Sequence, residues 1–123
     1  MTQITLKENA VLADPELQTA LKALNPKWGD FCIRAAGEAW GLPLIDQRTK
    51  ALIVVAVDVV NANENGPGSP FAAHVEMARK QGVTSEELEE LVVFMSVYAG
   101  FNKAASAIGR LKELEATRRA AST

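Results

Sequence analysis

Apolar residues recur at intervals of three and four along most of the chain, the spacing that places side chains on one face of an α-helix. In DPELQTALKAL, for example, Leu17, Leu21 and Leu24 share one stripe. Six segments of this kind, each taken with its capping residues, occupy residues 14–24, 25–41, 46–62, 69–82, 84–100 and 102–116. No segment alternates apolar and polar residues with the period of two that is typical of a β-strand. A strand elsewhere in the chain would therefore have no partner with which to form a sheet. The pattern predicts an all-α bundle of six helices.

Capping residues mark the ends of most of these segments. Asp14 and Asn25 each precede a proline, which is favoured at the first helical position because its missing N–H would have no partner there. Thr84 and Glu87 have the spacing of a capping box. The other predicted boundaries are starts at Asp46, at Ser69 with Pro70, and at Asn102, and stops at Gly41 and Gly82.

The segment DQRTKALIVVAVDVVNA, residues 46–62, is ambiguous because a β-branched apolar run can also be a buried strand. Its length, the cap at Asp46 and the lack of a sheet partner favour a helix. A helix that is apolar on all sides is buried, so we predict that this one is central and packed on several sides.

The length and composition bound the domain organisation. A chain of 123 residues, of which 48% are hydrophobic, can bury one core. We predict a single domain over residues 1–123, with an N-terminal arm at 1–12 and a flexible tail at 117–123. An isolated bundle of this size with so apolar a helix would expose much apolar surface, which favours a homo-oligomer.

Charge and cysteine content exclude several classes of function. A net charge of −2 does not supply the basic surface that nucleic acid binding needs. The longest apolar run is too short to span a membrane and is interrupted by Asp58, and no signal peptide is evident, so we expect a cytoplasmic protein. The single cysteine, Cys32, excludes an intrachain disulfide, a Cys-based zinc site and a Cys-x-x-Cys redox pair, and we interpret it as core packing.

The only histidine is the first candidate for chemistry. His74 shares a helical stripe with Phe71 and Ala78, so its ring should point inward or into a pocket. An imidazole there can exchange protons near neutral pH, or it can be a core histidine satisfied by a backbone carbonyl. Asp58 requires a partner if it is buried. It either forms a dyad with His74 or lies on an exposed or subunit-facing side.

Three stretches of the chain resemble the carboxymuconolactone decarboxylase family, a branch of the all-helical alkyl hydroperoxidase D-like superfamily. They are AAGEAWGLPLIDQRTKALIVVAV, HVEMARKQGVTSEELEELV and YAGFNKAASAI, and together they span about residues 28–112. The resemblance implies a helical protomer that assembles into a ring, commonly a trimer or hexamer. Peroxidase members carry a Cys-x-x-Cys pair before the matching histidine, and GPGSP occupies that place here, which excludes the peroxidase chemistry. The connection NANENGPGSP is longer than that of decarboxylase members.

The resemblance also implies an activity and a set of site residues. It implies a lyase that removes carbon dioxide from a small carboxylated lactone, or a related product of aromatic or polyketide metabolism, without a metal or organic cofactor. His74 would move the proton and Arg48 would hold the carboxylate. Asp58 stands where relatives usually have an aliphatic residue, so its predicted role of orienting the imidazole comes from the residues and not from the resemblance. The residues that would line the substrate pocket are Glu38, Trp40, Phe71, Tyr98 and Phe101.

Several of these residues could instead have a structural role that involves no substrate. Arg48 can be a solvated first-turn charge or pair with Asp46 or Glu38, and Trp40 can be a core residue. Tyr98 can hydrogen-bond a substrate oxygen or be buried with a backbone partner. The loop NENGPGSP can be a lid or a surface turn.

Two other functions remain open from the sequence. An isomerase, a cyclase or a lactone-opening enzyme needs the same proton transfer without release of carbon dioxide. A helical oligomer that binds a ligand or another protein without catalysis would have the same fold.

Overall fold

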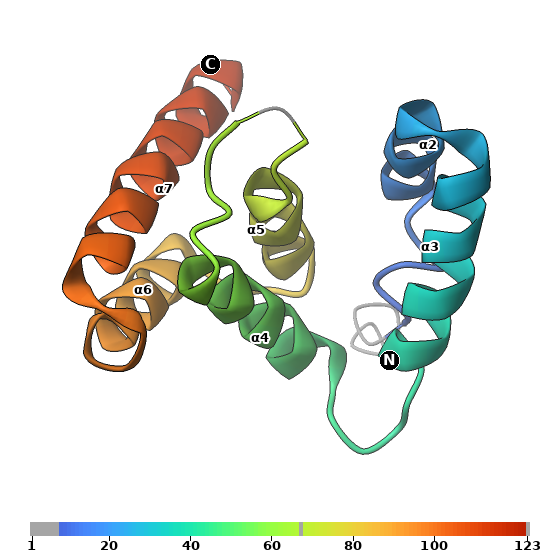
Figure 1. Ribbon diagram of the computed structural model, residues 1–123, viewed down its shortest axis with the longest axis horizontal. Coiled ribbons are helices and arrows are strands. Elements are labelled where there is room, and N and C mark those ends of the chain that lie inside the picture. Colours follow the sequence, from blue (N-terminus) through green and yellow to red (C-terminus); the bar gives the residue numbers. More distant parts are fainter. Residues whose placement is uncertain (1–7, 67, 123) are drawn as a thin grey trace. The chain divides into compact units, whose positions relative to one another are not determined.

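The computed structural model describes residues 8–66 and 68–122, and all regular secondary structure in them is helical (Figure 1). The prediction of an all-α fold with six helices is confirmed. The helices are α2 (Pro15–Leu24), α3 (Pro26–Trp40), α4 (Gln47–Val60), α5 (Phe71–Lys80), α6 (Ser85–Ala99) and α7 (Phe101–Ser122). None of the described helices is long and apolar enough to cross a membrane.

The chain divides into two compact units, residues 1–50 and 51–123, with the division inside α4. The single domain over residues 1–123 stays a prediction.

In the first unit, α2 and α3 pack against each other. The predicted caps hold, since the Asp14 side chain accepts from the backbone N–H of Leu17, and the Asn25 side chain accepts from that of Trp28. The described part of the predicted arm is fixed to these helices. Asn9 donates its amide to the carbonyl of Gly37 over 2.7 Å.

Gly29 is required where α2 meets α3. A Cβ at this position would lie 2.7 Å from the Lys22 Cα, which is too close for a backbone atom that cannot swing away. We expect Gly29→Ala to lower the free energy of unfolding by about 1–3 kcal/mol, the usual cost of overpacking. The matched control is Gly109→Ala in α7, where an added Cβ meets nothing within 4 Å. The free energy of unfolding of this control should rise by about 0.5–1 kcal/mol, because alanine has a higher helix propensity than glycine. Urea unfolding of both variants tests this prediction. Equal changes in the free energy of unfolding would contradict the close approach of α2 and α3 at Gly29.

The second unit contains most of α4 together with α5, α6 and α7. Helices α6 and α7 pack against each other, and the predicted capping box of Thr84 and Glu87 starts α6. The largest fully buried side chains all belong to this unit: Val55, Val59, Phe71, Leu88, Val92 and Leu111.

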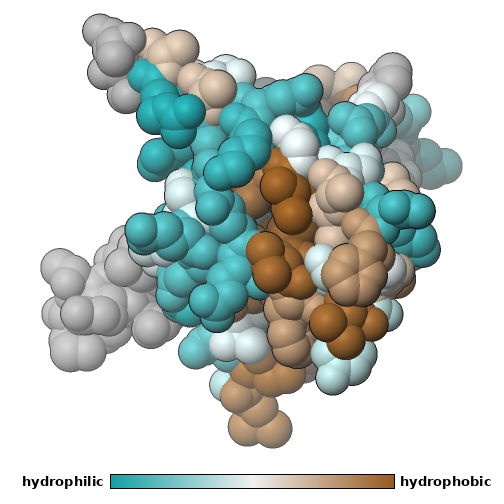
Figure 2. Space-filling model, turned by 90° about the vertical axis from the view of Figure 1, so that its left-hand side faces the viewer, coloured by the Kyte–Doolittle hydropathy of each residue, from teal (hydrophilic) through white to brown (hydrophobic). Residues whose placement is uncertain are grey.

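Helix α4 differs from the prediction of a helix packed on several sides. Val55 and Val59 are fully buried, but Ile53 and Val57 on the opposite side are 46% and 47% exposed. Within the second unit, the neighbouring helices cover only one face of α4. Figure 2 shows a band of apolar side chains open at one face of the molecule, among polar neighbours.

Two predicted boundaries were wrong. Pro70, not Ser69, is the N-cap of α5, and no side chain caps the helix. The Ser69 hydroxyl donates to the carbonyl of Asn63 and accepts weakly, over 3.5 Å, from the N–H of Phe71. At the other end of the unit, α7 begins at Phe101 and runs to Ser122 through most of the predicted tail. The residues of that segment, ATRRAAS, are mostly good helix formers without glycine or proline, so nothing in them ends the helix.

Candidate functional site

His74 on α5 and Asp58 on α4 are in direct contact. The His74 Nδ1 lies 2.5 Å from the Asp58 Oδ2. The Asp58 side chain is only 3% exposed, whereas the His74 side chain is 28% exposed. The carboxylate is therefore held out of water behind a ring that remains partly accessible. Because Asp58 engages Nδ1, the nitrogen left for exchange with a substrate is Nε2.

The helical spacing in α4 and in α5 places both residues of this pair on the buried faces of their helices. Asp58 follows Val55 by three residues and precedes Val59, and both valines are fully buried, so the carboxylate is on the inner face of α4. His74 lies between Phe71 and Ala78 on the buried face of α5. The predicted dyad geometry is thus present. The catalytic role of the two residues stays a prediction.

The loop between α4 and α5 is tied to both helices through Asn63. Its backbone N–H donates to the Asp58 carbonyl over 2.9 Å, and its side-chain amide lies 3.5 Å from the Asp58 Oδ1. Its own carbonyl accepts from the Ser69 hydroxyl, just before α5. The start of this loop is therefore anchored, in contrast to a freely moving lid.

Glu64 is a buried residue that the sequence did not single out. It is 4% exposed, and the Ser106 hydroxyl of α7 donates to its Oε2 over 2.5 Å. Arg110 Nε donates to the Glu64 carbonyl over 3.2 Å. These partners are 42 and 46 residues away, so no local pattern around NENG indicates the burial.

Three predicted pocket residues in the second unit occupy different environments. Phe71 is fully buried in the core, whereas Tyr98 and Phe101 are 74% and 73% exposed. The spacing predicts Tyr98 on the helical face of Leu91 and Met95, and seven residues at about 100° each do return it to the side of Leu91. That side is not the buried one, because Tyr98 lies about 120° around the helix from the fully buried Val92. Its ring instead packs at 5.3 Å, centroid to centroid, on Phe94 at the outer side of α6.

The other predicted site residues, Glu38, Trp40 and Arg48, belong to the first unit. Trp40 is buried, and its carbonyl accepts from Gln47 and Lys50 at the end of α3. Glu38 is exposed, and Arg48 is half-buried in the first turn of α4. Their roles in binding a substrate stay predictions.

A groove of about 500 Å³ lies in the second unit, and none of the predicted site residues lines it. Its lining consists of Leu52, Glu87, Glu90, Leu91, Val93 and Phe94. Within residues 8–66 and 68–122, no group of three or more His, Cys, Asp or Glu side chains is arranged to hold a metal ion.

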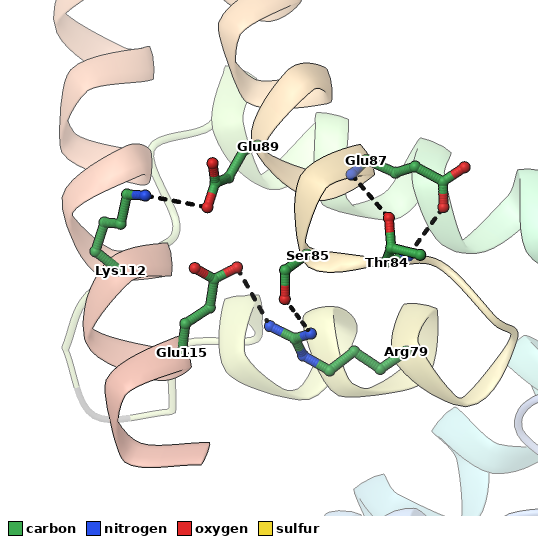
Figure 3. A network of polar contacts seen from close by, with 7 residues as sticks. All are labelled: Arg79, Thr84, Ser85, Glu87, Glu89, Lys112 and Glu115. Atoms are coloured by element: carbon green, nitrogen blue, oxygen red, sulfur yellow. Dashed lines mark hydrogen bonds and ion pairs between the residues drawn. The ribbon is translucent and has the colours of Figure 1, made fainter. Parts of the chain in front are cut away.

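A second polar network joins α5, α6 and α7 (Figure 3). The Arg79 guanidinium pairs with the Glu115 carboxylate over 3.6 Å and donates to the Ser85 hydroxyl over 2.8 Å. Both charged side chains are only 7% exposed. At the edge of this network, Lys112 pairs with Glu89 over 3.1 Å.

The hydrogen bond from Lys112 lowers the pKa of Glu89 from its ordinary 4.5, and a hydrogen bond with Glu115 acts in the same direction. A lowered folded-state pKa contributes stability above the unfolded pKa, and this contribution is lost as the pH falls through the folded value. Lys112→Met should therefore raise the pKa of Glu89 toward 4.5. Carboxyl NMR titration measures this. Lys103→Met is the control, because Lys103 donates to the carbonyl of Val60 and not to a carboxylate. A Glu89 pKa unchanged by Lys112→Met contradicts the assignment.

Comparison with known proteins gives two matches. The model of the carboxymuconolactone decarboxylase family matches residues 26–113. The chain is also similar to the 4-carboxymuconolactone decarboxylase of Acinetobacter baylyi, with 29% identity over 108 residues, covering 85% of this chain and 78% of the relative. No solved structure matches the chain significantly. The family match includes both members of the dyad.

Proposed function

Because the chain belongs to the carboxymuconolactone decarboxylase family, we propose that it is a cofactor-free lyase that decarboxylates a small carboxylated lactone. The observation that carries this proposal is the contact between the partly accessible His74 ring and the buried Asp58 carboxylate. The curated relative named as a decarboxylase supports the same reaction class.

The reaction needs one proton at carbon. When carbon dioxide leaves, the electrons of the broken carbon–carbon bond pass to the substrate and form an enolate on the lactone's conjugated carbonyl. A proton must then be added to carbon, and in this proposal the His74 Nε2–H donates it and regains it from solvent. Asp58 holds Nδ1 and stabilises the imidazolium before transfer. The substrate supplies the electron sink, so the scheme uses only these side chains.

The test is a product balance with 4-carboxymuconolactone. We expect one carbon dioxide released for each lactone consumed, with the decarboxylated lactone as the product. Evolved gas and NMR of the mixture measure both. Consumption of the lactone without release of carbon dioxide would favour a second candidate function, that of an isomerase, cyclase or lactone-opening enzyme. The feature of the chain that supports this second candidate is its longer connection NANENGPGSP. Binding without any turnover would favour a non-catalytic ligand-binding protein.

We also propose that the chain forms a homo-oligomer, such as the trimer or hexamer that the family resemblance implies. Exposed aliphatic and aromatic side chains on α4 and α6 support this, among them Ile53, Val57, Phe94 and Val97. Burying such a surface against another copy is favourable. Light scattering of the purified chain should give a mass several times that of the monomer, and a monomeric mass at micromolar concentration contradicts the proposal.

A further inference from the structure

Glu64 has no evident reason to be a glutamate. A carboxylate removed from water is costly unless its oxygens accept hydrogen bonds. Ser106 donates to Oε2, but the buried Oε1 has no hydrogen-bond partner among the residues that the structure describes. A smaller or apolar side chain would avoid this cost. What the Glu64 side chain gains in return is a connection to α7 through Ser106. Arg110 adds a bond from α7 to the backbone carbonyl of the same residue.

The next residue along the chain toward the dyad is Asn63. It contacts Asp58 through its backbone N–H and, more weakly, through its amide. It also accepts from Ser69, which stands just before the helix that carries His74. Asn63 therefore bridges the two helices of the dyad, and its position depends on the neighbouring residue that is fixed to α7.

We propose that Glu64 is a positioning residue. Fixed to α7 by Ser106 and Arg110, it holds Asn63 against Asp58 and so keeps the carboxylate aimed at the His74 Nδ1. This function in catalysis rests on the proposed lyase activity, whereas the geometric effect on His74 does not. The role needs the hydrogen-bond acceptor of Glu64 and not its charge.

The test uses the ring of the only histidine, which gives one set of ¹⁵N NMR signals. In the neutral ring of the wild-type protein, the Nδ1–H tautomer should dominate because its proton is donated to Asp58. We expect Glu64→Ala and Ser106→Ala to shift the population several-fold toward the Nε2–H tautomer. Glu64→Gln should leave it unchanged, since the glutamine carbonyl still accepts from Ser106.

Two matched controls separate this effect from general loosening. Ser96→Ala and Glu90→Ala remove a serine and a glutamate from α6, and neither should move the tautomer ratio. In turnover, Glu64→Ala should lower kcat about tenfold with little change in KM, as loss of an outer hydrogen-bond partner does. Glu64→Gln should stay within about twofold of the wild type, because it keeps that partner.

The outcomes distinguish the two proposals. A folded Glu64→Ala protein with the wild-type tautomer ratio overturns the positioning role, whatever its activity. If Glu64→Ala does not fold, Ser106→Ala decides by the same measurement, because it removes a single hydroxyl. If the tautomer shifts as expected but wild-type protein does not decarboxylate the lactone, the positioning role stands and the proposed function fails.

Discussion

Replacing His74 with glutamine should lower kcat for decarboxylation by about 10²–10⁴-fold, the usual contribution of a positioned acid–base group. Glutamine can still donate a hydrogen bond to the Asp58 carboxylate, which lies 2.5 Å from Nδ1 in the wild type, but it has no titratable proton for carbon. Steady-state kinetics with 4-carboxymuconolactone measure the loss, and circular dichroism checks the fold.

Asp58→Asn is the companion variant for this experiment. It keeps the size of the buried side chain but removes the charge that orients and stabilises the imidazolium. We expect a reduced kcat with the proton donor still present, and hence a smaller loss than for His74→Gln. Turnover of His74→Gln at the wild-type rate would exclude His74 as the proton donor.

The largest expected effect on stability is that of Glu115→Ala. This change leaves the Arg79 guanidinium, whose side chain is only 7% exposed, without its carboxylate partner. An unpaired buried charge costs about 3–5 kcal/mol. Urea unfolding should therefore show a much lower midpoint, provided that the variant remains folded in buffer.

The matched control is Glu113→Ala, two residues earlier on α7. Glu113 pairs with Arg110 over 3.2 Å, but its side chain is 68% exposed, so its loss should cost about 1 kcal/mol at most. The double change Arg79→Met with Glu115→Leu removes both charges and should recover most of the loss. If Glu115→Ala and Glu113→Ala have equal effects, burial does not decide the energetics of these pairs.

Local rules predicted most of the secondary structure. The caps at Asp14, Asn25 and Thr84 each depend on contacts within three residues, and the structure has all of them. At the start of α5, the Ser69 hydroxyl donates to the carbonyl of Asn63, six residues away, as well as accepting weakly from Phe71. A bond to so distant a partner is not visible in a helical pattern.

In the candidate site, too, local patterns predicted some residues, whereas contacts between distant parts of the chain decided the others. His74 and Asp58 stand out in the sequence as the only histidine and as the one charge in an apolar run. Periodicity places His74 on an inner face, whereas the side of Asp58 stayed open because the run is apolar all round. Glu64 resembles any polar loop residue, because its burial is decided by Ser106 on α7. The exposure of Tyr98 was not predicted, because α6 is apolar around most of its circumference, so the pattern did not define which side is buried.

The anchored loop has a consequence for how this fold changes in evolution. Gly66 and Gly68, near the tip, are exposed, and nothing lies within 4 Å of where a Cβ would be. Lengthening a loop between fixed ends costs only about 0.6 kcal/mol for each doubling of its length. Insertions at this tip should therefore be tolerated at little cost in stability, while the hydrogen bonds at Asn63 and Glu64 stay in place. The length of this connection can drift among related chains without disturbing the contact between His74 and Asp58.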